Sequence, residues 1–139
     1  MQQNYDDTNI FARILRGEIP AFKVYEDEQT LAFMDIMPQI RGHVLVIPKE
    51  PAVTVFEMSA EASLACMHTV QKVGKAIIQA LDAPGITLFQ QNGAGIGQTV
   101  PHAHFHLLPG SVFALKGHQA EMGNMDELKA LAAQIAAAL

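Results

Sequence analysis

Three histidines occupy alternate positions in an apolar stretch of the sequence, QTVPHAHFHLLPG at residues 98–110. Because successive side chains of a β-strand point to opposite faces, a strand here would place His102, His104 and His106 on one face. A proline stands at each end of the histidine run, as expected where a strand starts and stops. Neighbouring histidines would stand roughly 6.5 to 7 Å apart and the outer pair roughly 13 Å, which is too far for one metal ion to bind all three.

Three interpretations of this histidine run compete. In the first, the histidines only line a polar sheet face, which explains two such residues better than three beside a glycine-rich loop. In the second, a His-x-His pair binds a metal ion with a third ligand such as His43. This second interpretation leaves one histidine unused, and no Asp, Glu or Cys occurs between Gly85 and Gly117 to complete the site.

The third interpretation is nucleophilic catalysis, in which a neutral imidazole nitrogen attacks phosphorus and forms a covalent phosphoramidate. A histidine acts as a nucleophile when one ring nitrogen is free and the other holds the proton against an acceptor. His104 lies between the other two and is the candidate nucleophile. His102 and His106 would contact the phosphate oxygens and manage the proton that the leaving group needs. This chemistry uses all three histidines without a metal ion.

The glycine-rich segment NGAGIG, residues 92–97, leads into the histidine run. It lacks a Gly-Lys-Ser/Thr ending and precedes a strand, so it is neither a P-loop nor a dinucleotide-binding fingerprint. Alone, such a segment is typical of a hairpin turn. Beside three histidines, it could present backbone N–H groups and the side chains of Asn92, Gln98 and Thr99 to a phosphate.

The rest of the sequence predicts the elements that must position these residues. Thr8 or Asn9 can cap a short amphipathic helix, and the segment FKVYEDEQTLAFMDI predicts a β-hairpin. The apolar run HVLVIP predicts a buried strand that begins at His43, and a neighbouring strand could align this histidine with another. A long core helix is expected from about Ser59 to about Leu81, a strand at ITLFQ, and a further helix from about Met125. We assign no function to His68 on the long helix or to His118, which is expected in a loop.

Composition limits the class of protein. A chain of 139 residues with 50% hydrophobic and 17% charged residues is typical of one compact domain. Its formal charge of −5 argues against binding to a nucleic-acid backbone. The single cysteine, Cys66, is expected to be buried and excludes an internal disulfide. Neither a signal segment at the polar start nor an apolar run of ~20 residues occurs, so we expect a cytoplasmic protein without membrane contact.

The run HAHFHLL, residues 102–108, resembles the signature of the histidine triad (HIT) family, His-φ-His-φ-His-φ-φ with φ apolar. The segments IFARILRGEIPA, LAFMDIMPQIRGHVLVIPK and QNGAGIGQTVPHAHFHLLPG are also similar to that family, whereas the part from about Ser111 is not. The resemblance implies an α+β fold: a five-stranded antiparallel sheet packed with one long and one short helix, plus a C-terminal helix. We expect a single domain over residues 1–139, with its core at about 8–110 and a helical extension at about 111–139.

The resemblance also implies a function. It predicts a homodimer that acts on the α-phosphate of purine nucleoside monophosphate derivatives: phosphoramidates, adenylates or dinucleoside polyphosphates. A covalent nucleotidyl-histidine would form, with no metal or other cofactor. The alternative is a nucleotide-binding regulatory or interaction protein whose catalysis is incidental.

Positions of this sequence that match the family's motifs receive expected roles. His104 is the nucleophile, His102 and His106 are its partners on the phosphate side, and His43 is a fourth active-site histidine. The other expected nucleotide contacts are Asp35 for the ribose hydroxyls, Asn92, Gln98 and Thr99 for the phosphate or leaving group, and an apolar purine pocket formed by Ile10, Phe11, Ile14, Ile19, Phe33 and Ile36. The sequence departs from the family at Gly110, where many members carry Arg, and lacks the Trp-containing C-terminal tail of one branch.

Overall fold

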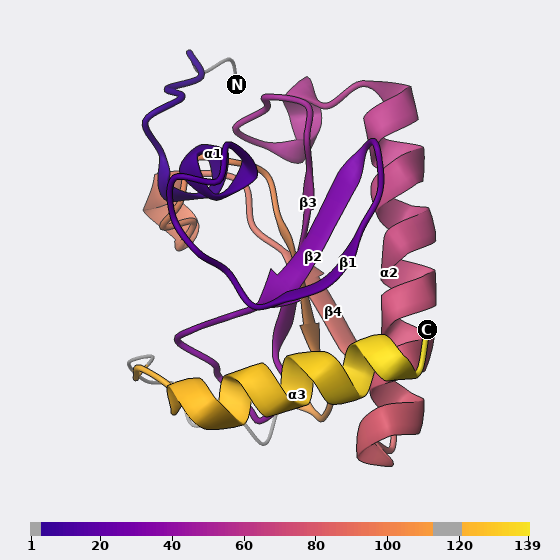
Figure 1. Cartoon of the computed structure of the whole chain (residues 1–139). Coiled ribbons are helices and arrows are strands. Elements are labelled where there is room, and N and C mark those ends of the chain that lie inside the picture. Colours follow the sequence, from indigo (N-terminus) through magenta and orange to yellow (C-terminus); the bar gives the residue numbers. More distant parts are fainter. Residues whose placement is uncertain (1–3, 113–120) are drawn as a thin grey trace.

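A five-stranded antiparallel sheet forms the centre of the computed structural model, which describes residues 4–112 and 121–139 (Figure 1). The spatial order of the strands is β1-β2-β3-β5-β4. Their bounds are β1 Lys23–Glu26, β2 Thr30–Met34, β3 Val44–Pro48, β4 Thr87–Gln90 and β5 Phe105–Leu108. The helices are α1 Ile10–Leu15, α2 Ala60–Leu81 and α3 Met125–Ala137, with short 3₁₀ turns at Val55–Glu57 and Ala94–Ile96. The predicted α+β fold is confirmed.

One face of the sheet carries the main hydrophobic core, which α2 and α3 cover. In Figure 1, α2 runs along one side of the sheet and α3 crosses its lower end. Every residue of β2 and β3 is buried, because these central strands have apolar side chains on both faces. Side chains of α3 belong to this core together with those of α2 and the strands, including Val44, Val46, Val73, Ile77, Leu107, Leu128, Leu131 and Ile135.

The opposite face of the sheet holds a smaller apolar cluster beneath α1. Phe11 and Ile14 of that helix pack against strand residues Leu31, Phe33, Leu45 and Ile47. Asn9 is the N-cap, and its side-chain oxygen accepts a hydrogen bond from the Ala12 N–H at 2.9 Å. This face therefore differs from the α2 face: it is covered by one short helix and by the chain that leads into it.

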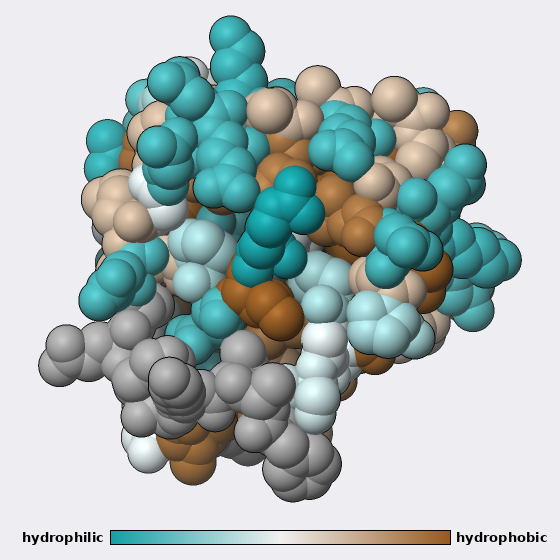
Figure 2. Space-filling model, turned by 90° about the horizontal axis from the view of Figure 1, so that it is seen from below, coloured by the Kyte–Doolittle hydropathy of each residue, from teal (hydrophilic) through white to brown (hydrophobic). Residues whose placement is uncertain are grey.

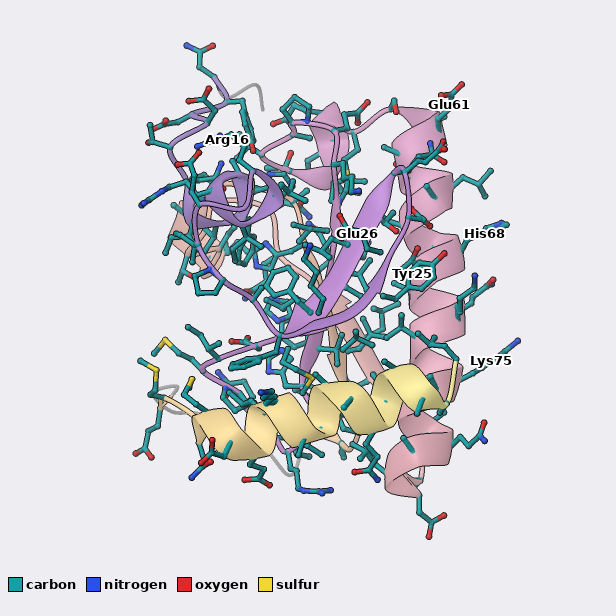
Figure 3. The ribbon with its side chains drawn as sticks, in the orientation of Figure 1. Arg16, Tyr25, Glu26, Glu61, His68 and Lys75 are labelled. Atoms are coloured by element: carbon teal, nitrogen blue, oxygen red, sulfur yellow. The ribbon has the colours of Figure 1, made fainter. Side chains whose placement is uncertain are left out.

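The long helix matches its prediction closely. Ser59 caps α2 through its hydroxyl, and the helix ends at Asp82 in the left-handed conformation. Cys66 is buried, as predicted. His68 is exposed and points away from the body of the molecule (Figure 3), whereas His118 lies outside the described residues.

The prediction that one strand carries all three histidines is wrong. Strand β5 begins at Phe105, so of the three only His106 lies in the sheet, where it pairs with Leu45 of β3. The preceding segment turns away: the His102 N–H bonds to the Val100 carbonyl, and the Ala103 N–H bonds to the Ala52 carbonyl. The histidine run is therefore only partly a strand, because His102 and His104 lie in the segment that leads into β5.

The surface of the molecule is mixed. Hydrophilic side chains cover much of the face seen in Figure 2, with apolar areas between them. Among the described residues, none of the helices combines the length and the apolar character needed to cross a bilayer.

Candidate active site

His104 lies just before β5, almost fully buried beneath α1. Its Nδ1 lies 2.6 Å from the His102 carbonyl oxygen. A carbonyl only accepts, so Nδ1 holds the proton. Burial lowers the pKa of His104, which keeps the ring neutral at pH 7 and leaves a lone pair on Nε2. The ring of Phe11 meets the imidazole edge-on, with centroids 5.0 Å apart. His104 is thus held in the tautomer that a nucleophile requires.

His102 is fully buried, and both of its ring nitrogens are engaged. Nε2 lies 2.8 Å from the Pro48 carbonyl, which accepts, so Nε2 carries the proton and Nδ1 is an acceptor. Burial lowers the pKa of His102 to about 4 and raises that of Tyr5, so both groups are neutral. The Tyr5 hydroxyl, 2.6 Å away, therefore donates to Nδ1. In this arrangement His102 supports His104 and presents no free nitrogen to a ligand.

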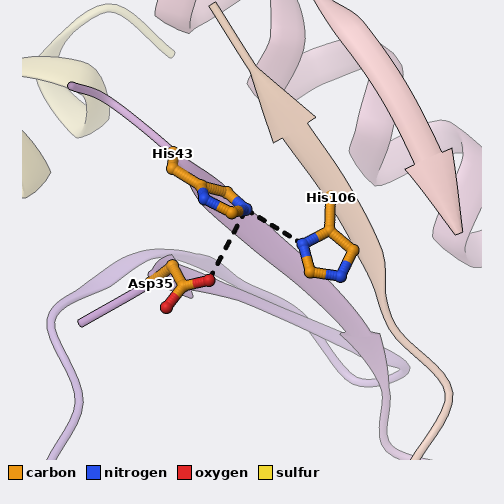
Figure 4. Close-up of side chains that lie close together, drawn as sticks. All are labelled: Asp35, His43 and His106. Atoms are coloured by element: carbon orange, nitrogen blue, oxygen red, sulfur yellow. Dashed lines mark hydrogen bonds and ion pairs between the residues drawn. The ribbon is translucent and has the colours of Figure 1, made fainter. Parts of the chain in front are cut away.

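His43 and His106 form a second hydrogen-bonded pair, drawn in Figure 4. The Gln39 N–H donates to His43 Nδ1 at 3.1 Å, so the proton of neutral His43 lies on Nε2. Nε2 lies 2.9 Å from His106 Nδ1, which must then accept and leave the His106 proton on its own Nε2. Burial lowers the pKa of His43 to about 4 and that of His106 to about 3.

The second ring nitrogen of His106, Nε2, carries an N–H group for which the described residues provide no acceptor. This nitrogen is buried. The ring centroids of His104 and His106 are 4.9 Å apart. Neighbouring rings therefore carry a lone pair on His104 Nε2 and an unpaired N–H on His106 Nε2, a combination that suits an electrophilic phosphorus with anionic oxygens.

Asp35 joins this pair from the end of β2. Its Oδ1 accepts the Met37 N–H at 2.8 Å, and its Oδ2 lies 3.5 Å from His43 Nε2. Burial raises the pKa of this carboxyl group to about 6. Asp35, His43 and His106 each offer one atom that could bind a metal ion, and these three atoms lie within 4.8 Å of one another.

The hydrogen bonds of this cluster fit a metal ion poorly. A metal-bound histidine usually donates its other ring N–H to an acceptor. Metal binding at His43 Nε2 would move the proton to Nδ1, where it would face the Gln39 N–H, which is itself a donor. We therefore interpret the three residues as a hydrogen-bonded chain.

The glycine-rich loop lies next to the histidines, but two of its predicted ligand residues are used within the protein. The Gln98 amide is buried: its oxygen accepts the Gly93 N–H, and its nitrogen donates to the Val53 and Val100 carbonyls. The Asn92 oxygen accepts hydrogen bonds from the Val55 N–H and the Gln90 side chain. These amides fix the loop, whereas Thr99 is exposed.

The predicted apolar pocket is divided between buried and exposed side chains. Phe11, Ile14 and Phe33 are buried, and the Phe11 and Phe33 rings meet edge-on at 5.4 Å. Ile19 is half-buried, whereas Ile10 and Ile36 are exposed by 51% and 45%. The structure thus places a packed apolar wall beside His104, with two free apolar side chains farther out.

Two residues of the site were not predicted from the sequence. Tyr5 precedes the first predicted element and lies 97 positions from its partner His102, so no local pattern indicates it. Phe89 stacks on His106 with centroids 4.2 Å apart and planes at 10°. The pairing of β4 with β5 places Phe89 opposite His106, and this could have been found by aligning the two predicted strands.

The fold is a five-stranded antiparallel sheet with α1 on one face, and beneath α1 lie histidines whose tautomers are fixed by hydrogen bonds. These features define a histidine triad protein. The family profile of the HIT domain matches residues 16–112, and the chain belongs to this family. It is similar to the adenosine 5′-monophosphoramidase hnt1 of Schizosaccharomyces pombe, with 42% identity over 100 residues covering 72% of each chain.

Two solved structures extend the similarity. A HIT-like protein involved in cell-cycle regulation from Bartonella henselae is 43% identical, with a TM-score of 0.89 over 99% of this chain and 100% of that one. A zinc-bound histidine triad family protein from Mycobacterium smegmatis is 30% identical, with a TM-score of 0.81 over 93% and 91% of the two chains. The similarity to the Bartonella protein covers 99% of this chain and therefore extends beyond the HIT domain at residues 16–112.

Proposed function

We propose that this protein hydrolyses nucleoside 5′-monophosphate derivatives at the α-phosphorus through a covalent nucleotidyl-histidine. The observation that carries the proposal is the tautomer of His104: its Nδ1–H is bonded to the His102 carbonyl at 2.6 Å, which leaves Nε2 free to attack. The unpaired Nε2–H of the adjacent His106 supplies a donor for a phosphate oxygen.

The reaction proceeds in two displacements. The lone pair of His104 Nε2 forms a bond to phosphorus while the bond to the leaving group breaks. The leaving group keeps that electron pair and takes up a proton from the solvent. Water then attacks the phosphorus, loses a proton to the solvent and breaks the P–N bond, which releases the nucleoside monophosphate and neutral His104.

The remaining parts of the site suit the rest of a nucleotide. The apolar wall that includes Phe11, Ile14 and Phe33 would contact a flat purine base, with Ile10, Ile19 and Ile36 at its edge. Asp35 accepts the Met37 N–H through Oδ1, and its other carboxylate oxygen, Oδ2, would accept the ribose hydroxyls. Thr99 and the loop fixed by Asn92 and Gln98 would lie on the phosphate side. Among leaving groups we favour amines, as in the activity named for the fission yeast relative.

The test uses adenosine 5′-phosphoramidate as substrate and His104→Ala as the variant. We expect hydrolysis by the wild type, loss of turnover by at least 1,000-fold in the variant, and retained binding of adenosine 5′-monophosphate. His68→Ala, which changes an exposed histidine on α2, is the matched control and should keep full activity. Quenching a wild-type reaction at early times should reveal a protein adduct with the mass of one adenylyl group.

The opposite result separates the two functions expected from the sequence. Tight nucleotide binding by the wild type, with negligible turnover of phosphoramidates, dinucleoside polyphosphates and aminoacyl adenylates, would contradict the enzyme proposal. It would favour the regulatory nucleotide-binding protein.

We further propose that the protein is a homodimer joined through the β4 edge. Leu88 of this edge strand is 42% exposed and pairs with Leu107, whose side chain belongs to the α2 core, so Leu88 faces the α2 side of the sheet. Leu64, Met67 and Ile78 are exposed along α2. An open apolar edge strand beside exposed apolar helix residues is a surface that a second copy would cover.

Light scattering coupled to size-exclusion chromatography tests this assembly. We expect a dimer for the wild type and a monomer for Leu88→Glu, because the change places a charge in the apolar contact. Ile10→Glu alters another exposed apolar residue, on α1 at the opposite face of the sheet, and should remain dimeric. A monomeric wild type, or a dimer unaffected by Leu88→Glu, would contradict the proposal.

A further inference from the structure

The proton on His43 Nε2 has two acceptors within reach. His106 Nδ1 lies 2.9 Å away and Asp35 Oδ2 lies 3.5 Å away, on the two dashed lines of Figure 4. The Gln39 N–H holds the opposite nitrogen of His43 as an acceptor, so the ring has only this one proton to share. Both acceptors therefore compete for the same N–H group.

How this N–H group is shared decides how firmly His106 presents its donor to a phosphate. When it is given to His106 Nδ1, that nitrogen accepts, and His106 holds its proton on Nε2 as a donor. When Asp35 attracts part of it, the bond to His106 Nδ1 weakens. Because linked hydrogen bonds polarise one another, the Nε2–H of His106 then becomes a weaker and less firmly held donor.

Asp35 is a strong competitor because of where it lies. The carboxyl group is largely buried, and burial raises its pKa to about 6, so it is a carboxylate at pH 7 in a poorly solvated position. Its Oδ1 is occupied by the Met37 N–H, which leaves Oδ2 as the oxygen that faces His43. Any donor that engages Oδ2 reduces its attraction for the His43 proton.

We propose that the ribose hydroxyls of the substrate act as this donor and thereby strengthen the His43–His106 hydrogen bond, which holds His106 as a hydrogen-bond donor to the phosphate. The inference rests on the proposed function, in which Asp35 contacts the ribose. Sugar recognition then affects the rate of phosphoryl transfer as well as the affinity for substrate. Asp35 is a positioning residue here, because it acts on the phosphate through His43 and His106.

The experiment compares adenosine 5′-phosphoramidate with its 2′,3′-dideoxy analogue. For the wild type we expect kcat to fall about tenfold with the dideoxy substrate, in addition to any rise in KM. Asp35→Asn removes the competing charge while keeping the shape of the side chain, so the two substrates should have nearly equal kcat. Asp126→Asn, at an exposed acid in the first turn of α3, should keep the wild-type ratio.

A second measurement follows the hydrogen bond directly. In imidazole ¹H and ¹⁵N spectra of the wild type, adenosine 5′-monophosphate should move the His43 Nε2–H proton signal downfield, the direction of a stronger hydrogen bond, by more than the 2′,3′-dideoxy nucleotide does. Equal kcat for the two substrates in the wild type, with the whole difference in KM, would overturn the inference and leave the proposed hydrolase intact. A kcat ratio that persists in Asp35→Asn would also overturn it. No turnover of either substrate would overturn the proposed function itself.

Discussion

Replacing Tyr5 with Phe removes one hydroxyl from the group of residues around His104, the proposed nucleophile. The Tyr5 hydroxyl is the donor to His102 Nδ1 at 2.6 Å, and His102 has no exposed surface. Its other ring nitrogen is committed to the Pro48 carbonyl, so the ring cannot reverse its tautomer without losing that bond. Leaving a buried acceptor without a donor costs about 1–3 kcal/mol. For a chain of this size, that corresponds to a fall in Tm of roughly 4–12 °C.

Urea unfolding and thermal unfolding of Tyr5→Phe measure this loss. The matched control is Tyr25→Phe, since Tyr25 donates to Asp27 at 3.0 Å near the surface between β1 and α2 (Figure 3). We expect the control to lose about 0.5 kcal/mol, because water can replace a hydroxyl at an accessible site. Equal stability of the two variants would refute the assignment of Tyr5 as the donor, and with it the tautomer derived for His102.

Three further predictions concern protonation, backbone shape and metal. The pKa values of His43 and His106, lowered to about 4 and 3, keep both rings neutral below the ordinary value of 6.5, whereas Asp35, whose pKa is raised to about 6, becomes protonated as the pH falls from 7 to 5.5. The fall in kcat/KM over this range should therefore be smaller in Asp35→Asn than in the wild type; an equal half-loss near pH 6.5 in both would contradict this. Gly42→Ala should cost about 1–3 kcal/mol in urea unfolding, because φ is +90° and the new Cβ would lie 2.5 Å from Leu81 Cδ1, whereas Gly85→Ala meets no atom within 4 Å and should be neutral. Dialysis against EDTA should leave phosphoramidate hydrolysis unchanged, and activity restored only by added Zn²⁺ would support the metal interpretation.

The fold was largely predictable because its signals are local. Asn9 and Ser59 cap helices where the sequence predicts them, and the β1–β2 hairpin turns at residues 27–29, one position after the predicted acidic segment 26–28. The start of β5 was not predictable from alternation alone. Residues 102–104 alternate as in a strand, but their backbone bonds go to Val100 and Ala52, and such partners cannot be identified without the tertiary structure.

The candidate site divides in the same way. The histidine pattern identifies His104 and its neighbours, and a lone strand-end histidine such as His43 gains meaning only when β3 pairs with β5. The tautomers were outside the reach of sequence, because they depend on which atom faces each ring nitrogen. Tyr5 is the hardest residue to predict, because it lies 97 positions from His102 in the sequence and meets it only in the folded chain.

Three of the atoms that fix the histidine protons belong to the main chain: the Gln39 N–H, the Pro48 carbonyl and the His102 carbonyl. Side-chain substitution at those positions leaves such partners in place, with the exception of Gln39→Pro, which deletes the N–H. The tautomers of His43 and His104 are therefore fixed by the path of the backbone, whereas the surfaces that would select a base and a leaving group are built from side chains. In a chain organised in this way, the exposed residues of the apolar wall can be changed while the proposed nucleophile, His104, keeps its proton on Nδ1.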